Sequence, residues 1–154
     1  MSRQAWNRNM QILTAIAADR GIDPFMEHLS ALGPPTFDEQ GASFELQLQP
    51  CHMNGVYSAH GGLMMTLMDV VMACSASDDE RTCVTVEMKS NFIRPGGQAG
   101  QRLKAQGFVR ARGNSLAFCD GEIRNQDGEL LATASGTFKY IKAKTDHSQQ
   151  QVGA

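Results

Sequence analysis

The stretch from residue 60 to residue 77 reads HGGLMMTLMDVVMACSAS and is the strongest helix candidate in the chain. Apolar side chains occupy nearly all of its circumference, so we expect this helix to be buried on most of its sides. Asp69 is the one charged residue in it. A helix this apolar needs a second layer packed against it, and the flanking sequence must supply that layer.

The sequence after this helix, residues 82–141, alternates between apolar and polar side chains. Turn signals at residues 95–97, 113–114 and 127–128 divide it into four long strands. Strands that follow one another through hairpins pair antiparallel. In the first of these strands the expected apolar face holds Val84, Val86, Met88 and Phe92, and the expected polar face holds Thr85, Glu87, Lys89 and Asn91.

The sequence before the helix adds two shorter strands, at residues 36–40 and 42–49, and a loop at residues 50–59. The simplest way to bury the central helix is an α+β fold in which a curved antiparallel sheet of about five to six strands wraps around it. Such a sheet leaves its own outer face and the entrance of the helix uncovered, which favours a dimer.

The 154 residues fit one folded domain. We expect that domain at residues 34–142, after a helical N-terminal extension at residues 1–33 and before a polar tail at residues 143–154. The tail carries few apolar residues that could anchor it to the domain.

Composition argues against several classes of protein. The formal net charge of -2 argues against a generic nucleic-acid binder. The most apolar stretch, residues 63–74, is 12 residues long and contains Asp69, so no membrane span is expected. The first nine residues lack the apolar core of a signal peptide, and the four cysteines form neither a CxxC pair nor a zinc spacing. We therefore expect a cytoplasmic protein with reduced thiols and no metal site.

The central helix begins with His60, Gly61 and Gly62. The glycines leave backbone N–H groups open at a helix end with partial positive charge, so this end could hold a developing oxyanion. A glycine pair at a helix start also permits a sharp entry turn, and taken alone that structural role is the more common one. Asp69 leaves two interpretations equally open, because a carboxylate on an apolar helix is either hydrogen-bonded to a neighbour or used in chemistry.

The spacing of these groups predicts how many chains form one site. Gly61 and Asp69 are eight residues apart, which is ~12 Å along a helix axis. One substrate atom cannot be within hydrogen-bond distance of both. If both act on one carbonyl, two copies of the helix lie antiparallel, with Gly61 of one protomer facing Asp69 of the other. This predicts a homodimer with two composite sites, or a dimer of such dimers.

Residues 54–69, NGVYSAHGGLMMTLMD, resemble the Asn, His-Gly-Gly and Asp signature of hotdog-fold acyl-CoA thioesterases. The similarity is to the branch named after PaaI and thioesterase-superfamily member 2, and it runs over residues 37–140. It implies the hotdog fold, a strongly curved antiparallel sheet around one long helix. It also implies hydrolysis of an acyl-CoA thioester, so that coenzyme A is part of the substrate and no separate cofactor is expected.

The resemblance further implies roles for five residues. Asp69 matches the catalytic carboxylate, which acts as nucleophile or as general base on a water. Gly61 matches the residue whose N–H polarises the thioester carbonyl, and His60 matches an orienting group beside that carbonyl. Asn54 matches a loop amide that positions the carbonyl or the lytic water, and Thr85 matches a hydroxyl residue that assists the water. In the family, the Asn and His-Gly-Gly residues come from one subunit and the acid and hydroxyl from the other.

The sequence leaves the substrate and two alternative functions open. Substrate contacts are expected from Gly62, Met65, Met68 and Arg94. A further set of basic residues is a candidate for the phosphates of coenzyme A or for a solvated strand face: Arg102, Lys104, Arg110 and Arg112. The alternatives to a thioesterase are a hotdog enoyl-CoA hydratase or dehydratase and a non-catalytic acyl-CoA-binding protein. The preferred acyl group is not specified by the sequence.

Overall fold

The computed structural model describes residues 25–26, 29, 35–78 and 81–141. From residue 35 onward its elements are β1 (Thr36–Phe37), β2 (Ala42–Gln47), the short 3-10 helix η1 (Pro50–His52), α3 (Gly61–Ala76), β3 (Thr82–Phe92), β4 (Arg102–Arg112), β5 (Leu116–Asn125) and β6 (Leu130–Ile141). The prediction of one long helix followed by four long strands is confirmed. The helix is one residue shorter than predicted at each end, because His60 and Ser77 are its caps.

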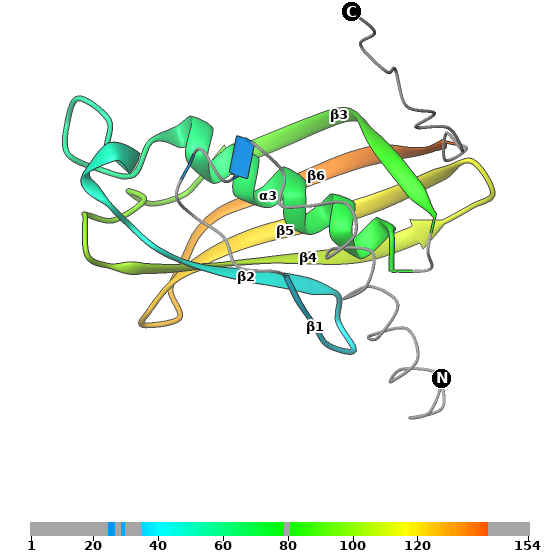
Figure 1. Cartoon of the computed structure of the whole chain (residues 1–154), viewed down its shortest axis with the longest axis horizontal. Helices are drawn as coiled ribbons and strands as arrows, with labels where there is room; N and C mark the ends of the chain where they lie inside the picture. The colour runs from blue at the N-terminus through cyan, green and yellow to red at the C-terminus, as the bar shows by residue number, and fades with distance from the viewer. Residues whose placement is uncertain (1–24, 27–28, 30–34, 79–80, 142–154) are drawn as a thin grey trace, which may run out of the picture.

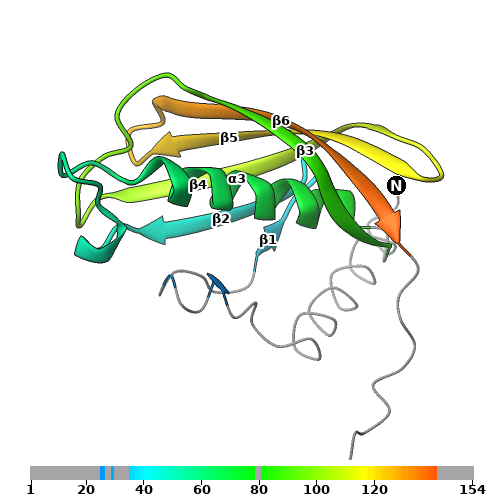
Figure 2. The ribbon, with the colours of Figure 1, turned by 90° about the horizontal axis from the view of Figure 1, so that it is seen from above.

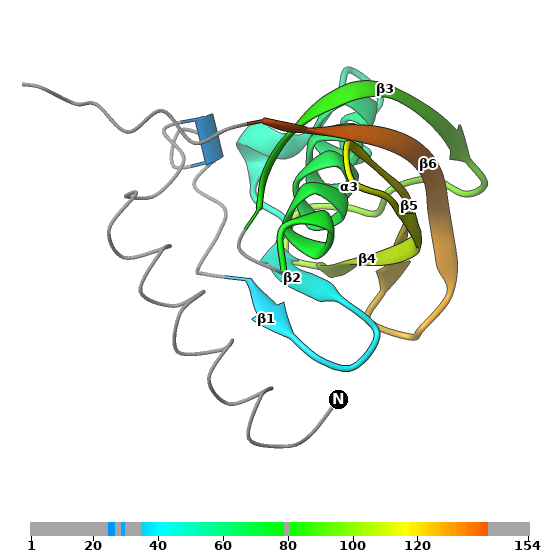
Figure 3. The same cartoon turned by 90° about the vertical axis from the view of Figure 1, so that its right-hand side faces the viewer.

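The six strands form one antiparallel sheet in the order β1-β2-β4-β5-β6-β3. Along the chain, α3 connects β2 to β3, which lies at the far edge of the sheet. Figures 1 and 2 show the helix lying lengthwise across the sheet, and Figure 3 shows the sheet curving around it. The predicted α+β fold, with a curved sheet wrapped around one helix, is therefore confirmed.

The hydrophobic core lies between α3 and the concave face of the sheet. The buried residues of α3 are Leu63, Met64, Leu67, Met68, Val71, Met72, Ser75 and Ala76. β4 approaches the helix so closely at Gly107 that a Cβ there would lie 2.4 Å from the carbonyl oxygen of Val71. The sheet can pack this tightly only because that residue is a glycine.

The opposite side of α3 is not covered by any of the described residues. Gly62 is exposed, Met65 is 38% exposed and Asp69 is half-buried. These three residues are three and four positions apart, so they lie on one stripe, which we call the open face of α3. The prediction of burial on most sides holds toward the sheet and fails at this stripe, because one curved sheet does not enclose a helix that is apolar all round.

β3 is an edge strand, and its side chains follow the predicted alternation only in part. Its pairing with β6 shifts between Thr85 and Glu87, which places a β-bulge at Val86. Val84 and Val86 are 45% and 57% exposed, whereas the hydroxyl of Thr85 points at α3. The predicted faces are therefore wrong up to the bulge, because an inserted residue reverses the inside–outside pattern on one side of it. After the bulge they hold, since Met88 packs against the core while Lys89 and Asn91 are exposed.

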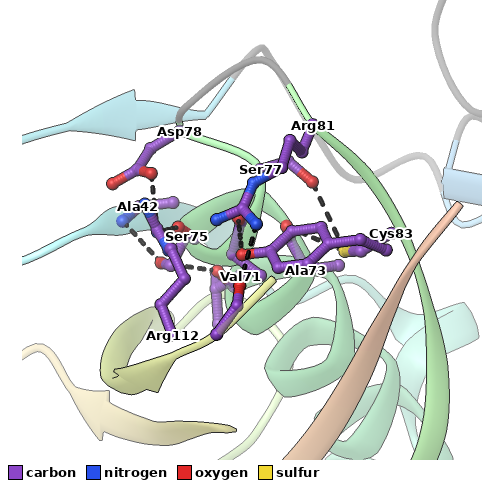
Figure 4. A network of polar contacts seen from close by, with 12 residues as sticks. Ala42, Val71, Ala73, Ser75, Ser77, Asp78, Arg81, Cys83 and Arg112 are labelled. Carbon is purple, nitrogen blue, oxygen red and sulfur yellow. Dashed lines mark hydrogen bonds and ion pairs between the residues drawn. The ribbon is translucent and has the colours of Figure 1, made fainter. Parts of the chain in front are cut away.

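A network of polar contacts fixes the C-terminal end of α3 (Figure 4). Ser75 Oγ donates to the carbonyl of Val71 (2.8 Å) and accepts the N–H of Ala42 in β2 (2.9 Å). Arg112 of β4 donates to the carbonyl of Ser75 (3.0 Å) and forms an ion pair with Asp78 (2.6 Å). These contacts attach the last turn of the helix to two strands of the sheet.

β6 adds a further attachment at the same end. The hydroxyl of Tyr140 donates to the carbonyl of Ala76 (2.9 Å), and the guanidinium of Arg81 lies 3.6 Å from the centre of the Tyr140 ring. Elsewhere on the sheet, Arg110 pairs with Asp120 at 2.5 Å. Two members of the basic set considered for phosphate binding, Arg110 and Arg112, therefore have partners within the fold.

Most of the predicted N-terminal extension and all of the predicted tail lie outside the described residues, so the division of the chain at residues 34 and 142 stays a prediction. Phe25 and Met26 are helical, and Met26 is 3% exposed and belongs to the core. The loop predicted at residues 50–59 contains η1, a short helix that was not predicted from the sequence. No helix in the described part of the chain is long and apolar enough to cross a membrane.

Candidate active site

The loop that leads into α3 is organised around Asn54. Its Oδ1 accepts the N–H groups of Val56 (3.0 Å) and Ser58 (3.1 Å), and its own N–H donates to the carbonyl of Ser58 (2.8 Å). The side-chain oxygen is thus fully engaged in shaping the loop, as is common for Asn in turns. The side-chain amide Nδ2 has no hydrogen-bond partner within the described residues, so it remains a donor for another molecule.

His60 caps the start of α3. Its N–H donates to the carbonyl of His52 (2.8 Å), and its Nδ1 accepts the N–H of Gly62 (2.9 Å). A neutral imidazole that accepts at Nδ1 carries its proton on Nε2, so Nε2 is a donor. Of the two glycine N–H groups expected to face a ligand, the one of Gly62 is therefore occupied by the cap.

The N–H of Gly61 is the donor that remains at this helix end. None of the described residues accepts a hydrogen bond from it. A Cβ at Gly61 would lie 3.4 Å from Cζ of Phe92, so the aromatic ring at the end of β3 lies close to this glycine. An unpaired N–H at a helix N-terminus, beside an apolar ring, is suited to bind a carbonyl oxygen or oxyanion.

Asp69 and Thr85 are brought together from α3 and β3. Thr85 Oγ1 donates to Asp69 Oδ1 at 2.7 Å. This hydrogen bond fixes one oxygen of the carboxylate, and the other, Oδ2, has no hydrogen-bond partner within the described residues. A carboxylate that is held at one oxygen and open at the other can take a proton or attack a carbon without first being reoriented.

The predicted residues thus form two groups on one helix. Asn54, His60 and Gly61 lie at its N-terminal end, and Asp69 with Thr85 lies two turns further along, ~12 Å from Gly61 along the axis. Gly62 and Asp69 both lie on the open face of α3. A single protomer therefore presents both groups on one uncovered surface without placing them around one substrate atom.

The predicted substrate contacts have different surroundings. Gly62 and Met65 lie on the open face, as described above. Met68 is 0% exposed and packs against Gly121 of the sheet, so its contact with substrate stays a prediction. Met68 points toward the sheet, whereas Met65 points away from it. Arg94 is exposed, and its Nη1 donates to the carbonyl of Leu130 (2.7 Å), which leaves the rest of the guanidinium facing solvent.

A cavity of about 320 Å³ lies beside the start of α3 and was not expected from the sequence. Its lining residues are Phe25, Leu29, Cys51, His52, Met53, His60, Gly62, Leu63 and Thr66. They come from the N-terminal segment, η1 and the first turns of α3, which no local pattern could have linked. Asp69 and Thr85 do not line it, so the cavity adjoins the oxyanion end of the site and not the carboxylate end.

The cysteines supply no reactive group in the buried part of the molecule. Burial raises the pKa of Cys74 and of Cys119 to about 12, so both thiols stay protonated at neutral pH. Within the described ranges no group of three or more His, Cys, Asp or Glu side chains could hold a metal ion.

Comparison with known proteins places this geometry among thioesterases. The family model described as Thioesterase superfamily matches residues 58–132. The acyl-coenzyme A thioesterase PaaI of Escherichia coli K12 is 30% identical over 138 residues, which are 88% of this chain and 91% of that protein. Human acyl-coenzyme A thioesterase 13 is 28% identical over 96 residues, 60% of this chain and 68% of the human protein.

The fold comparison points the same way. The solved structure of the E. coli PaaI protein from the phenylacetic acid degradation operon has a TM-score of 0.77 and 26% sequence identity to this chain. The match covers 88% of this chain and 95% of the other. His60, Gly61, Asp69 and Thr85 all lie inside the segment that the family model matches, and Asn54 lies just before it.

Proposed function

We propose that the substrate of this chain is an acyl-CoA or aryl-acyl-CoA, because the chain belongs to the PaaI-like branch of the thioesterase superfamily and is a hotdog-fold thioester hydrolase. The products are the free acid and coenzyme A. The acyl-CoA thioesterase activity in the names of two relatives supports this substrate class. The observation that carries the catalytic part of the proposal is the 2.7 Å hydrogen bond from Thr85 to Asp69, which holds a carboxylate ready at the open face of α3.

We place the complete site between two protomers. The open face of α3 and the edge strand β3 are the surfaces on which a second copy would pack. An antiparallel pair of α3 helices would place Gly61 of one protomer opposite Asp69 of its partner. Each dimer then has two sites, each with Asn54, His60 and Gly61 from one chain and Asp69 and Thr85 from the other. Sedimentation should give at least twice the 16.8 kDa of one chain. A monomer with full activity would exclude this arrangement.

Asp69 has two possible routes to products. In the general-base route it takes a proton from a water whose oxygen bonds to the thioester carbon. The carbonyl oxygen becomes an oxyanion that accepts a hydrogen bond from the Gly61 N–H. The C–S bond then breaks with its electron pair going to sulfur, and the proton held by Asp69 passes to the thiolate. The acid and the thiol leave, and Asp69 is again a carboxylate.

In the nucleophilic route an oxygen of Asp69 attacks the thioester carbon and expels the thiolate. The mixed anhydride that results is hydrolysed by water, which restores the carboxylate and releases the acid. Rapid acid quenching followed by mass spectrometry of the peptide that contains Asp69 separates the two routes. Only the nucleophilic route adds the mass of the acyl group to that peptide.

The remaining residues orient the substrate. The Nδ2 group of Asn54 and the Nε2 group of His60 have no hydrogen-bond partner within the described residues, and either can hold the carbonyl or the water. Thr85 keeps Asp69 in one orientation. Arg94 is the cation that we assign to the phosphates of coenzyme A, because its guanidinium is exposed and anchored at one end to the carbonyl of Leu130.

The proposal is tested with purified full-length protein and a panel of acetyl-, octanoyl-, palmitoyl- and phenylacetyl-CoA. Free thiol is measured continuously, and hydration of crotonyl-CoA is measured in parallel. Thiol release from at least one thioester, with no hydration of the enoyl-CoA, is the expected result. Hydration without thiol release, or binding of acyl-CoA without any reaction, would contradict the proposal.

A further inference from the structure

The cavity beside the start of α3 has apolar walls. Its apolar lining residues include Phe25, Leu29, Met53 and Leu63. Its volume of about 320 Å³ is at the lower end of the ~300–1,000 Å³ typical of ligand pockets. One water takes up ~30 Å³ in the liquid, so the cavity has room for roughly ten non-hydrogen atoms.

Two polar side chains in these walls, His52 and Thr66, already have hydrogen-bond partners. His52 is 3% exposed; its Nδ1 accepts the N–H of Gln49 (2.9 Å), and its Nε2 is 2.6 Å from the carbonyl oxygen of Leu29. Thr66 Oγ1 donates to the carbonyl of Gly62 (2.9 Å). A charged or hydrogen-bonding ligand group would lose its water here without gaining a partner, which is unfavourable.

One side-chain donor that lines the cavity, the Nε2 of His60, lies at the end of the cavity next to Gly61. His60 and Gly62 border the cavity and flank Gly61, and the Nε2 of His60 has no partner within the described residues. A carbonyl bound at the Gly61 N–H therefore lies at the mouth of the cavity. The group attached to that carbonyl has an apolar space of limited size directly beside it.

We infer that this cavity is the acyl subsite, and that it takes an uncharged apolar acyl group of up to roughly ten carbons beyond the carbonyl. The group is either one aromatic ring or a medium alkyl chain. The inference rests on the proposed function, since it assumes that a thioester carbonyl binds at Gly61. It assigns acyl selectivity to Phe25, Met53, Leu63 and Thr66 in place of the core residue Met68.

The subsite is tested by binding, so that the readout does not depend on hydrolysis. The probes are S-alkyl-CoA thioethers, which lack the carbonyl and cannot be hydrolysed, with methyl, butyl, octyl, hexadecyl, 2-phenylethyl and 7-carboxyheptyl groups. Their dissociation constants are measured by calorimetry. Each methylene buried is worth about a four-fold gain in affinity as an upper value. Affinity should rise from methyl to octyl, should not rise further to hexadecyl, and should fall at least ~10-fold when the octyl chain ends in a carboxylate. The phenylethyl probe reports whether a ring is accepted as well as a chain.

Two variants change the cavity in opposite ways. Thr66→Phe fills it and should weaken octyl binding by about ten-fold or more while leaving methyl binding unchanged. Phe25→Ala removes apolar wall and should weaken octyl binding about three- to ten-fold. Thr36→Phe in β1 is the matched control, and the binding profile of this variant should equal that of the wild type. β1 pairs with the start of β2, where Ala42 bonds to Ser75, so it lies by the other end of α3.

The outcomes separate the two proposals. Chain-length-dependent binding that Thr66→Phe abolishes, in a protein that releases no thiol from any thioester, would keep the subsite and reject the proposed function. The opposite outcome is a folded Thr66→Phe variant that still releases thiol and whose affinity for the octyl probe is unchanged, or falls by the same factor as its affinity for the methyl probe. That result would reject the subsite and keep the function. Melting curves of each variant confirm that the compared proteins are folded.

Discussion

The two ends of α3 differ in how completely their polar groups are paired. At the C-terminal end, the Ser75 hydroxyl donates to the carbonyl of Val71 and accepts the N–H of Ala42 in β2. Arg112 of β4 and Tyr140 of β6 donate to the last carbonyl groups of the helix. At the N-terminal end, the N–H of Gly61 and the Nε2 of His60 have no partner within the described residues.

This difference indicates how one helix serves both stability and chemistry. An unpaired donor at a half-open helix end contributes nothing to folding, and it is ready for a ligand that brings negative charge. The opposite end fixes the helix to the sheet, so the donors at the start of α3 are held in a defined direction. We therefore expect substitutions near the open end and on the open face to reduce activity, and substitutions at the closed end to reduce stability.

The largest expected effect is on activity, at Asp69. Asp69→Asn keeps the shape of the side chain and an acceptor for Thr85 but removes the charge that takes a proton or attacks the carbon. We expect the hydrolysis rate to fall by about 10²–10⁴-fold or more. Affinity for acyl-CoA should be retained, and the melting temperature should hold or rise, because an amide costs less to bury than a carboxylate.

The measurement takes rate, affinity and melting temperature from one preparation. Asp127→Asn is the matched control, because Asp127 is exposed in the turn between β5 and β6. It should behave as the wild type in all three. A well-folded Asp69→Asn variant that hydrolyses its best substrate at close to the wild-type rate would end the mechanism proposed here.

The next largest effect on activity is expected at Asn54, where the amide oxygen and the amide NH₂ group of the side chain can be tested separately. Asn54→Asp keeps the oxygen that accepts the N–H groups of Val56 and Ser58 and replaces the free amide donor. We expect turnover to fall by about 10²–10³-fold, the typical cost of one positioned donor, with little change in melting temperature. Asn54→Ala removes both functions and should also lower the melting temperature. If Asn54→Asp has wild-type turnover, the residue serves only to shape the loop.

Much of the fold could be predicted from the sequence, because its signals are local. A largely apolar helix with glycines at its start, followed by alternating segments between turn residues, indicates the order of α3 and the four long strands after it. It was harder to predict which side chains of these elements face the core and which face outward. A helix that is apolar all round has no amphipathic phase, so the sequence could not show that Met68 faces the sheet while Met65 faces away.

The site was predictable in part. The glycines and Asp69 stand out by residue type and spacing, and Thr85 was found only through the resemblance to a family. The bulge at Val86 turns Thr85 toward Asp69, and a bulge depends on strand pairing that no short segment encodes. The cavity could not be predicted, because Phe25 and Met53 meet there only through the tertiary fold.

At the closed end, the largest effect on stability is expected at Ser75. The residue is 0% exposed, and Ser75→Ala leaves the buried N–H of Ala42 without its acceptor. An unpaired buried group of this kind costs about 1–3 kcal/mol. For a domain of this size each kcal/mol corresponds to roughly 2–4 °C in melting temperature. Ser135→Ala on the exposed side of β6 is the control. The kcat of folded Ser75→Ala should equal that of the wild type, and a loss of kcat without a loss of stability would contradict the separation of the two ends.

The smallest effect is expected at Tyr140. Tyr140→Phe removes the hydroxyl that donates to the carbonyl of Ala76 and keeps the ring on which Arg81 stacks. We expect the free energy of unfolding to fall by about 0.5–1.5 kcal/mol in denaturant titrations, with hydrolysis unchanged. The chain offers a matched control in Tyr57, its other tyrosine, which is 79% exposed; Tyr57→Phe should leave the free energy of unfolding unchanged within about 0.5 kcal/mol. Equal stabilities of the Tyr140→Phe and Tyr57→Phe variants would show that the bond to Ala76 does not help to hold the last turn, and that Ser75 and Arg112 fix the closed end without it.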